Sequence, residues 1–269
     1  MTLASVLACC CLFAPAAAML DYSRVHLVDH DPHTGNLLFR GNMPANGTHV
    51  FAIDLLLQYL RERAHEAAID FPVAGNFTLT DISLNNNFDG KDFKAERDFW
   101  ANPATKRLGN FVNWPLGLAG IVGPGHYPRS KVGPMSNGSV WKVDRIPAHV
   151  AQIRAWLLAK QDKPLVQYVH CTAGCDRTGE VIGAYRMRYQ PASGFQGTPV
   201  IPMYALDTAE CGRSPNYWSS TALEWFCEYI KYNNVGAGAA HVGDCEGFAT
   251  CTFAGKCQPT HNQSVLALQ

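Results

Sequence analysis

The sequence predicts an α/β fold in which helices flank a central mixed, mostly parallel sheet, followed by a disulfide-stapled C-terminal extension. Short apolar runs typical of strands alternate along the chain with longer segments whose apolar residues have helical spacing. The 269 residues are 47% hydrophobic and carry no formal net charge, which supports a sizeable core and excludes general disorder. Five of the seven cysteines that follow residue 18 lie after residue 210, and this clustering predicts disulfides formed in an oxidising compartment.

The first strand is predicted at residues 35–40, and the segment 49–68 has apolar residues at helical spacing with charged residues on its other face. A strand at 77–84, a short helix at 91–101 and a strand at 109–114 follow, and the Gly- and Pro-rich stretch 117–138 is expected to be a loop.

The second half of the chain repeats the alternation. A helix is predicted to begin near Pro147, a buried strand at 164–169 and a helix at 178–189. Residues 190–217 are expected to form a loop, and a last helix is expected at about 218–232.

The N-terminal segment 1–18 carries no charged side chain and ends in small residues, which predicts a secretory signal peptide cleaved after about Ala18. A buried N-terminal helix is the alternative. The run is too short to favour a membrane span, so we expect no stable membrane insertion. The mature protein is therefore expected to be secreted, or to reside in the lumen of the secretory or endolysosomal pathway, as one domain at 19–234 with a Cys-rich tail at 235–269. Four glycosylation sequons agree with export, at Asn46, Asn76, Asn137 and Asn262.

The segment most informative about chemistry is His-Cys-Thr-Ala-Gly-Cys-Asp-Arg-Thr-Gly, residues 170–179, which joins the buried strand to a helix. A loop at a helix N-terminus directs several backbone amides and the positive end of the helix dipole to one point, where an oxyanion binds. Arg177 would add a planar fork for two phosphate oxygens. In the same field, Cys171 is favoured as a thiolate nucleophile, and Thr178 can donate a hydrogen bond to its sulfur.

This segment resembles the signature loop of the cysteine-dependent protein tyrosine phosphatase superfamily, including its dual-specificity branch. The resemblance spans about residues 37–232 and implies a protein tyrosine phosphatase-like fold for the domain at 19–234. It implies hydrolysis through a phosphocysteine intermediate, without metal or cofactor, with Cys171 as the nucleophile and Arg177 as the phosphate clamp. The implied substrate-binding residues are Thr172, Ala173, Gly174, Cys175 and Arg177.

The family also uses an upstream aspartic acid to protonate the leaving oxygen. Asp144, which lies 27 residues before Cys171 and just before Pro147, has a similar placement, although the Pro of the family's Trp-Pro-Asp loop is missing. Asp144 could instead serve only the helix dipole. Asp176, inside the loop, is the rival acid, or it orients Arg177 or the loop backbone. His126 is a remote third candidate.

Cys175 lies on the same loop as the nucleophile and leaves two alternatives open. It could pair with Cys171 on oxidation and protect it, or it could be a small side chain that points into the core. The His- and Asp-rich stretch 26–33 is interpreted as a polar surface loop rather than a metal site. The cysteines at 245, 251 and 257 have no zinc-site spacing and are expected to form disulfides.

The expected partner is a phosphorylated protein or a small phosphomonoester. Nucleic acid is not expected as a partner, because a chain without net charge has no overall positive potential to attract it. Because the variable loop positions carry no base, a phosphotyrosine-type or broad phosphoprotein phosphatase is the leading hypothesis. Phosphoinositide or inositol-phosphate hydrolysis is the alternative enzymatic function. A non-enzymatic alternative is an inert secreted module that binds phosphate without hydrolysing it. The bases at 129, 131, 142 and 145 could meet an acidic substrate or simply solvate their loop.

Overall fold

The computed structural model describes residues 19–117, 122–190, 200–213, 216–235, 245, 250–251 and 257–258. The predicted signal peptide, the fourth sequon and most of the tail lie outside these residues. The strands are β1 His26–Asp31, β2 Asn36–Asn42, β3 Thr78–Ser83, β4 Gly109–Asn113, β5 Leu165–Cys171, β6 Thr250–Cys251 and β7 Cys257–Gln258. The α-helices are α1 Ile53–Glu66, α2 Gly90–Ala101, α3 Arg129–Ser136, α4 Ile146–Leu158, α5 Asp176–Tyr189, α6 Val200–Cys211 and α7 Tyr217–Asn233. Short 3-10 turns are η2 Tyr22–Arg24, η3 Lys106–Leu108, η4 Pro124–His126 and η5 Ser139–Trp141.

The main sheet has five strands in the order β1-β2-β5-β3-β4. β1 runs antiparallel to β2, and the other neighbouring strands are parallel. The prediction of a mixed, mostly parallel sheet flanked by helices is therefore confirmed. β5 is the central strand, so its carboxyl end lies at the middle of the sheet edge, where open α/β sheets place their sites.

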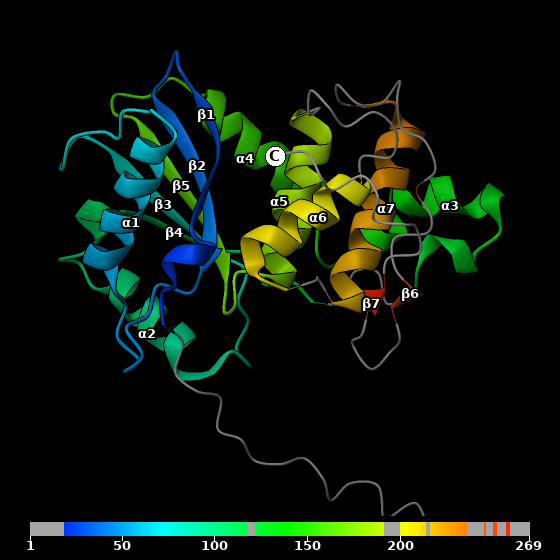
Figure 1. The fold of residues 1–269 in the computed structure, drawn as a ribbon, viewed down its shortest axis with the longest axis horizontal. Helices are drawn as coiled ribbons and strands as arrows, with labels where there is room; N and C mark the ends of the chain where they lie inside the picture. Colours follow the sequence, from blue (N-terminus) through cyan, green and yellow to red (C-terminus); the bar gives the residue numbers. More distant parts are fainter. Residues whose placement is uncertain are drawn as a thin grey trace, which may run out of the picture.

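Helices cover both faces of this sheet, with α1 and α2 on one side and α4, α5 and α6 on the other, while α7 and α3 lie furthest from the sheet (Figure 1). The alternation of side chains along β2 shows how the faces are assigned. Leu37 and Phe39 pack in a cluster with Leu56 and Leu60 of α1, whereas Leu38 packs in the cluster formed with α4, α5 and α7. Successive residues of a strand point to opposite faces, so the middle of this strand, which is buried on both faces, is apolar without alternation.

Three elements differ from the sequence-based expectations. The stretch expected as a polar surface loop contains β1, an edge strand whose half-exposed face tolerates His and Asp. The expected loop 117–138 contains α3, which packs on α7 through buried Val132 and an ion pair between Arg129 and Glu228 at 3.2 Å. The expected loop 190–217 contains α6, whose Pro202 lies in the first turn, where proline is tolerated. In the last two cases local composition suggested a loop, but packing against a neighbouring helix stabilises the helical state.

Two disulfides are present, Cys175–Cys211 and Cys227–Cys245. The second joins α7 to the tail and agrees with the predicted stapling of the C-terminal region. Cys171 is the free cysteine among those whose side chains are described. Within the described ranges, no helix has the length and apolar content required to cross a bilayer.

Candidate active site

The signature loop lies between the carboxyl end of β5 and the first residue of α5, as its sequence predicted. Cys171 ends the central strand and is 2% exposed. Gly174 makes the tight turn possible because its φ is +70° and because a Cβ there would lie 2.6 Å from the backbone of Gly41. The loop therefore folds closely over the end of β2.

Two arginines bind the outer side of this loop. Arg24 donates to the carbonyl oxygen of Ala173 at 2.7 Å, and Arg40 donates to the carbonyl oxygen of Gly174 at 2.7 Å. In a trans peptide unit the N–H points opposite to the C=O, so the amides of Gly174 and Cys175 are turned away from the arginines. Neither amide donates to an acceptor within the residues that the structure describes. The loop thus presents free donors on one side, which is the arrangement that an oxyanion requires.

Arg177, in the first turn of α5, lies at the same site. Its two terminal nitrogens donate to the two carboxylate oxygens of Asp89, each at 2.7 Å, and one also donates to the carbonyl of Leu84 at 3.2 Å. Burial alone would lower the pKa of Arg177, but Asp89 and the nearby Cys171 raise it. The guanidinium is thus charged, half-buried and within electrostatic range of Cys171.

Asp89 was missed by the sequence analysis, although it links both ends of the loop. Besides binding Arg177, it accepts a hydrogen bond from the hydroxyl of Thr172 at 2.9 Å. Burial alone would raise the pKa of Asp89, but the hydrogen bonds from Arg177 and from the amide of Asn86 hold it below its usual value. Asp89 directly precedes α2 and lies 88 positions before Arg177, so no local sequence pattern joins the two.

His170 supports the loop from inside the core. Its Nε2 lies 2.7 Å from a carboxylate oxygen of Glu96 and 3.0 Å from one of Asp81, and all three side chains are fully buried. Although burial opposes it, these two carboxylates raise the pKa of His170, which places a positive charge next to Cys171 in the chain. The three side chains could together hold a metal ion. However, their carboxylates already accept hydrogen bonds from Trp100 and Ser83, and the ion pair accounts for the arrangement.

Thr178 is also where the sequence predicted it. Its side chain is fully buried, and its hydroxyl has no hydrogen-bond partner within the described chain. The expected hydrogen bond from this hydroxyl to the sulfur of Cys171 is therefore not formed, and the hydroxyl lies one residue after Arg177 without another acceptor among the described residues.

The candidate acids have different surroundings. Asp144 is 1% exposed and accepts a hydrogen bond from the amide of Gly117 at 2.6 Å, just before α4. Asp176 forms two bonds with Arg213, at 3.0 and 2.6 Å, and accepts from the amide of Asn216. Because Asp89 binds the guanidinium of Arg177, the alternative that Asp176 orients this arginine is not supported. His126, the third candidate, lies in η4.

A further buried carboxyl, Glu180, was not identified from the sequence. It lies one turn after Asp176 on α5 and accepts a hydrogen bond from the hydroxyl of Ser219 at 3.1 Å. Burial, reinforced by the charges of Asp144, Asp176 and Cys171, raises its pKa to about 8.

The raised pKa of Glu180 predicts a pH-dependent stability. Since the folded state holds the proton up to about pH 8 while the unfolded chain releases it near 4.5, the free energy of unfolding falls as pH rises between these values. Glu180→Gln should remove this loss and raise the free energy of unfolding at pH 8 by at most about 4 kcal/mol, with no gain below pH 4.5. Urea unfolding at both pH values measures the difference, and an equal change at both would contradict it.

The structure pairs Cys175 with Cys211 of α6 and not with Cys171, whereas the alternative of a side chain that points into the core agrees with its burial. Cys175 is fully buried and directly precedes α5, while Cys171 stays a thiol. The proposed pairing of the two loop cysteines with each other is therefore not what the fold contains.

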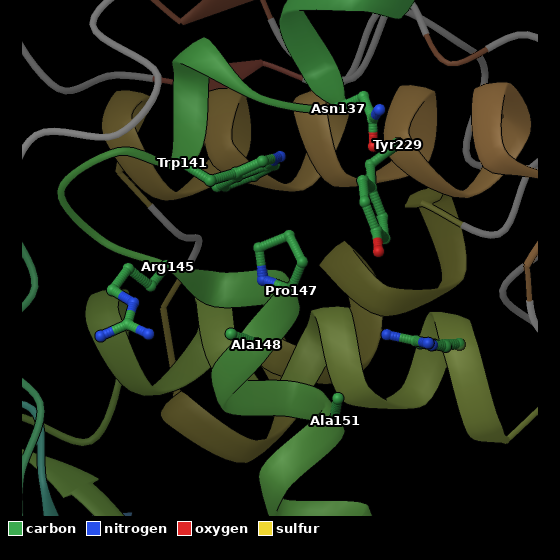
Figure 2. A pocket seen from close by; sticks show the side chains of 8 residues that line it. Asn137, Trp141, Arg145, Pro147, Ala148, Ala151 and Tyr229 are labelled. Carbon is green, nitrogen blue, oxygen red and sulfur yellow. The ribbon is translucent and has the colours of Figure 1, made fainter.

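A separate cavity of about 440 Å³ lies beside the N-terminus of α4, between Trp141, Pro147 and Tyr229 (Figure 2). Arg145 and Arg188 also line it, but no residue of the signature loop does. Two of the bases that were considered for an acidic substrate therefore have other places in the structure. Arg145 lines this cavity, and Arg129 is paired with Glu228.

No family model matches the sequence, and no curated protein matches it. Among solved structures, the chain is similar to TpbA of P. aeruginosa, with 15% identity over 65% of this chain and 70% of that chain and a TM-score of 0.23. A variant of human DUSP28 gives 16% identity over 77% and 98%, with a TM-score of 0.33. A TpbA variant with serine in place of a cysteine, in complex with phosphotyrosine, gives 13% identity over 85% and 98%, with a TM-score of 0.27. Because the TM-scores are below 0.5, these similarities carry no argument about the function of this chain. A function has to be supported by the geometry of the signature loop.

Proposed function

We propose that this chain is a phosphomonoesterase that hydrolyses phosphotyrosine-type or broad phosphoprotein substrates through a phosphocysteine intermediate. The observation that carries the proposal is the placement of the free thiol of Cys171 beside the charged Arg177, under a loop whose outward carbonyls are bound by Arg24 and Arg40. Inward amides and a guanidinium fork together bind the non-bridging oxygens of a phosphoryl group.

In the first step the thiolate of Cys171 attacks phosphorus, and the bond from phosphorus to the leaving oxygen breaks. The amides of Gly174 and Cys175 and the guanidinium of Arg177 stabilise the charge on the equatorial oxygens. The leaving oxygen takes a proton from a carboxylic acid, for which Asp144 is proposed. The products are the dephosphorylated substrate and phosphocysteine.

In the second step a water molecule attacks phosphorus and gives its proton to the same carboxylate, and the bond from phosphorus to sulfur breaks. The hydroxyl of Thr178, which is buried and uncommitted, donates to the departing sulfur. The cycle ends with free phosphate and the Cys171 thiolate, and it consumes no metal, oxidant or cofactor.

The assignment of the acid makes a kinetic prediction. Asp144→Asn should lower kcat about 10²-fold and remove the basic limb of the pH–rate profile, because a general acid contributes about 10²–10⁴-fold. Asp176→Asn should keep that limb, since both oxygens of Asp176 are engaged by Arg213. Loss of the basic limb in the Asp176 variant alone would transfer the role to Asp176.

The function is tested by incubating the purified protein with p-nitrophenyl phosphate in the presence of a chelator and measuring released phosphate. Phosphotyrosyl peptides and phosphoinositides in parallel assays separate the leading substrate class from the alternative, and we expect the peptides to be hydrolysed faster because Thr172, Ala173, Gly174 and Cys175 provide no base for additional phosphates. A wild type that binds phosphate but releases none from any of these substrates would instead identify an inert binding module.

Secretion remains part of the proposal and is supported by two features. Two disulfides require an oxidising compartment, and the sequon asparagines Asn46, Asn76 and Asn137 are all exposed. Expression of the full chain in a secreting eukaryotic host should yield a protein in the medium whose N-terminus lies near residue 19. Treatment with N-glycosidase should lower its apparent mass on gels. A protein retained in the cytosol, unglycosylated and with residues 1–18 intact, would contradict it.

A further inference from the structure

We propose that helix α6 positions the signature loop, through the Cys175–Cys211 disulfide and through Arg40, so that the nucleophilicity of Cys171 depends on this helix. The inference deepens the proposed function and rests on it for its kinetic consequence. Cys211, Asp207 and Arg40 are positioning residues here, because each acts on the loop and not on the substrate.

The first connection between α6 and the loop is covalent. Cys211 is the last residue of α6, and its Cα lies 5.2 Å from that of Cys175, within the range that disulfides span. Cys175 directly precedes the first residue of α5, at the position where the loop becomes a helix. The disulfide therefore fixes the backbone at the point from which the amides and the helix dipole face the phosphate.

The second connection is ionic and acts one residue earlier. Arg40, 1% exposed, donates to the carbonyl of Gly174, and its terminal nitrogens lie 2.6 Å from Asp207 and 2.7 Å from Glu210. Arg186 of α5 in turn donates to both oxygens of Glu210. Arg40 thus extends from two carboxylates of α6 to the loop. A buried guanidinium with these partners has little freedom to release the carbonyl.

Close contact between helices shows that α6 lies directly against this region. A Cβ at Gly179, in the first turn of α5, would lie 2.6 Å from the carboxylate oxygens of Asp207. The side chain of Asp207 thus packs directly on the backbone of Gly179, so a shift of α6 would be transmitted to the start of α5. The two connections hold adjacent residues, 174 and 175, whose amides are the ones turned inward.

The alternative is that the disulfide only stabilises the fold, and the chain contains a matched control. Cys227–Cys245 joins α7 to the tail and includes no residue of the signature loop. Both disulfides close loops of modest length, 36 and 18 residues, so their contributions to stability by the loop-entropy argument are similar. Positioning and stabilisation therefore predict different results for the two.

The experiment compares the double variants Cys175→Ser/Cys211→Ser and Cys227→Ser/Cys245→Ser. The rate constant for alkylation of Cys171 by iodoacetamide at pH 6 is followed by mass spectrometry of the signature peptide, together with kcat/KM for p-nitrophenyl phosphate and Tm. In the first variant we expect both rate constants to fall about tenfold or more, since the thiolate loses fixed donors. In the control both should stay within about twofold of wild type while Tm falls.

Two further measurements keep the test decisive if the first variant does not fold. Asp207→Asn leaves the disulfide intact and weakens the ion pair with Arg40, and it should slow alkylation of Cys171 about three- to tenfold. Treatment of the Cys227→Ser/Cys245→Ser variant with dithiothreitol transfers two electrons and two protons to Cys175–Cys211, so that this disulfide becomes two thiols while the reagent becomes its cyclic disulfide. Activity should fall and return on reoxidation.

Equal alkylation rates in wild type, the Cys175/Cys211 variant and Asp207→Asn would overturn the inference, even if Tm were lower. A protein that shows the expected alkylation rates but hydrolyses no phosphate ester would leave the positioning by α6 in place and would refute the proposed function instead. The two failures are therefore distinguishable.

Discussion

Replacement of the nucleophile, Cys171→Ser, should lower the hydrolysis of p-nitrophenyl phosphate by at least about 10⁴-fold while the fold is kept. A serine hydroxyl is similar in size to the thiol but is not ionised near neutral pH, so it is a much weaker nucleophile. Cys171 is buried at the end of the central strand and has no disulfide partner, so the change removes no cross-link.

The control for this prediction is retained binding. Because the inward amides and Arg177 are unchanged, the serine variant should still bind phosphotyrosine, with an affinity within about tenfold of wild type by isothermal titration calorimetry. Residual hydrolysis above about 1% of wild type would contradict the assignment of Cys171, since it would require another nucleophile.

Arg177→Lys should lower kcat/KM about 10³-fold, although the charge is conserved. The planar fork of Arg177 binds two oxygens of Asp89 at once, and the same geometry suits two oxygens of a phosphoryl group. Lysine offers a single point charge that cannot bind both Asp89 and the substrate in this way. The loss should be larger in kcat than in 1/KM, because the charge on the equatorial oxygens is stabilised most in the transition state.

Arg213→Lys is the matched control for this substitution. Arg213 forms two bonds with Asp176 near the same helix end, but its side chain is 46% exposed. We expect a loss of less than about tenfold for this variant. Similar losses for Arg177→Lys and Arg213→Lys, measured as kcat/KM for p-nitrophenyl phosphate, would show that general positive charge matters and that the fork does not.

The parts of the site that the sequence could predict are those that are contiguous. Cys171, Arg177 and Thr178 lie within eight residues, and the strand, loop and helix that present them follow one another along the chain. The chemistry of this segment is therefore largely local. The alternation of apolar strands and amphipathic helices predicted the fold class for the same reason, because each element's pattern is set by its own two faces.

The residues that could not be predicted are joined only by tertiary structure. Asp89, Arg40 and Arg24 bind the loop from 88, 134 and 149 positions away along the chain, and nothing in their local sequence indicates that contact. Helix α6 was missed because Pro and Gly surround it, although packing against α5 stabilises it. Glu180 was missed because a carboxylate in the first turns of a helix is ordinary in sequence, and only its burial makes it unusual.

The central claim is that a phosphoryl group is transferred to the sulfur of Cys171. The most direct measurement is rapid acid quenching of the protein during turnover of a phosphotyrosyl peptide, followed by mass spectrometry of the peptide that contains residues 170–177. We predict a mass increase of one phosphoryl group on Cys171, and none in Cys171→Ser. Steady release of phosphate with no phosphorylated Cys171, or with the phosphoryl group on another residue, would contradict the account.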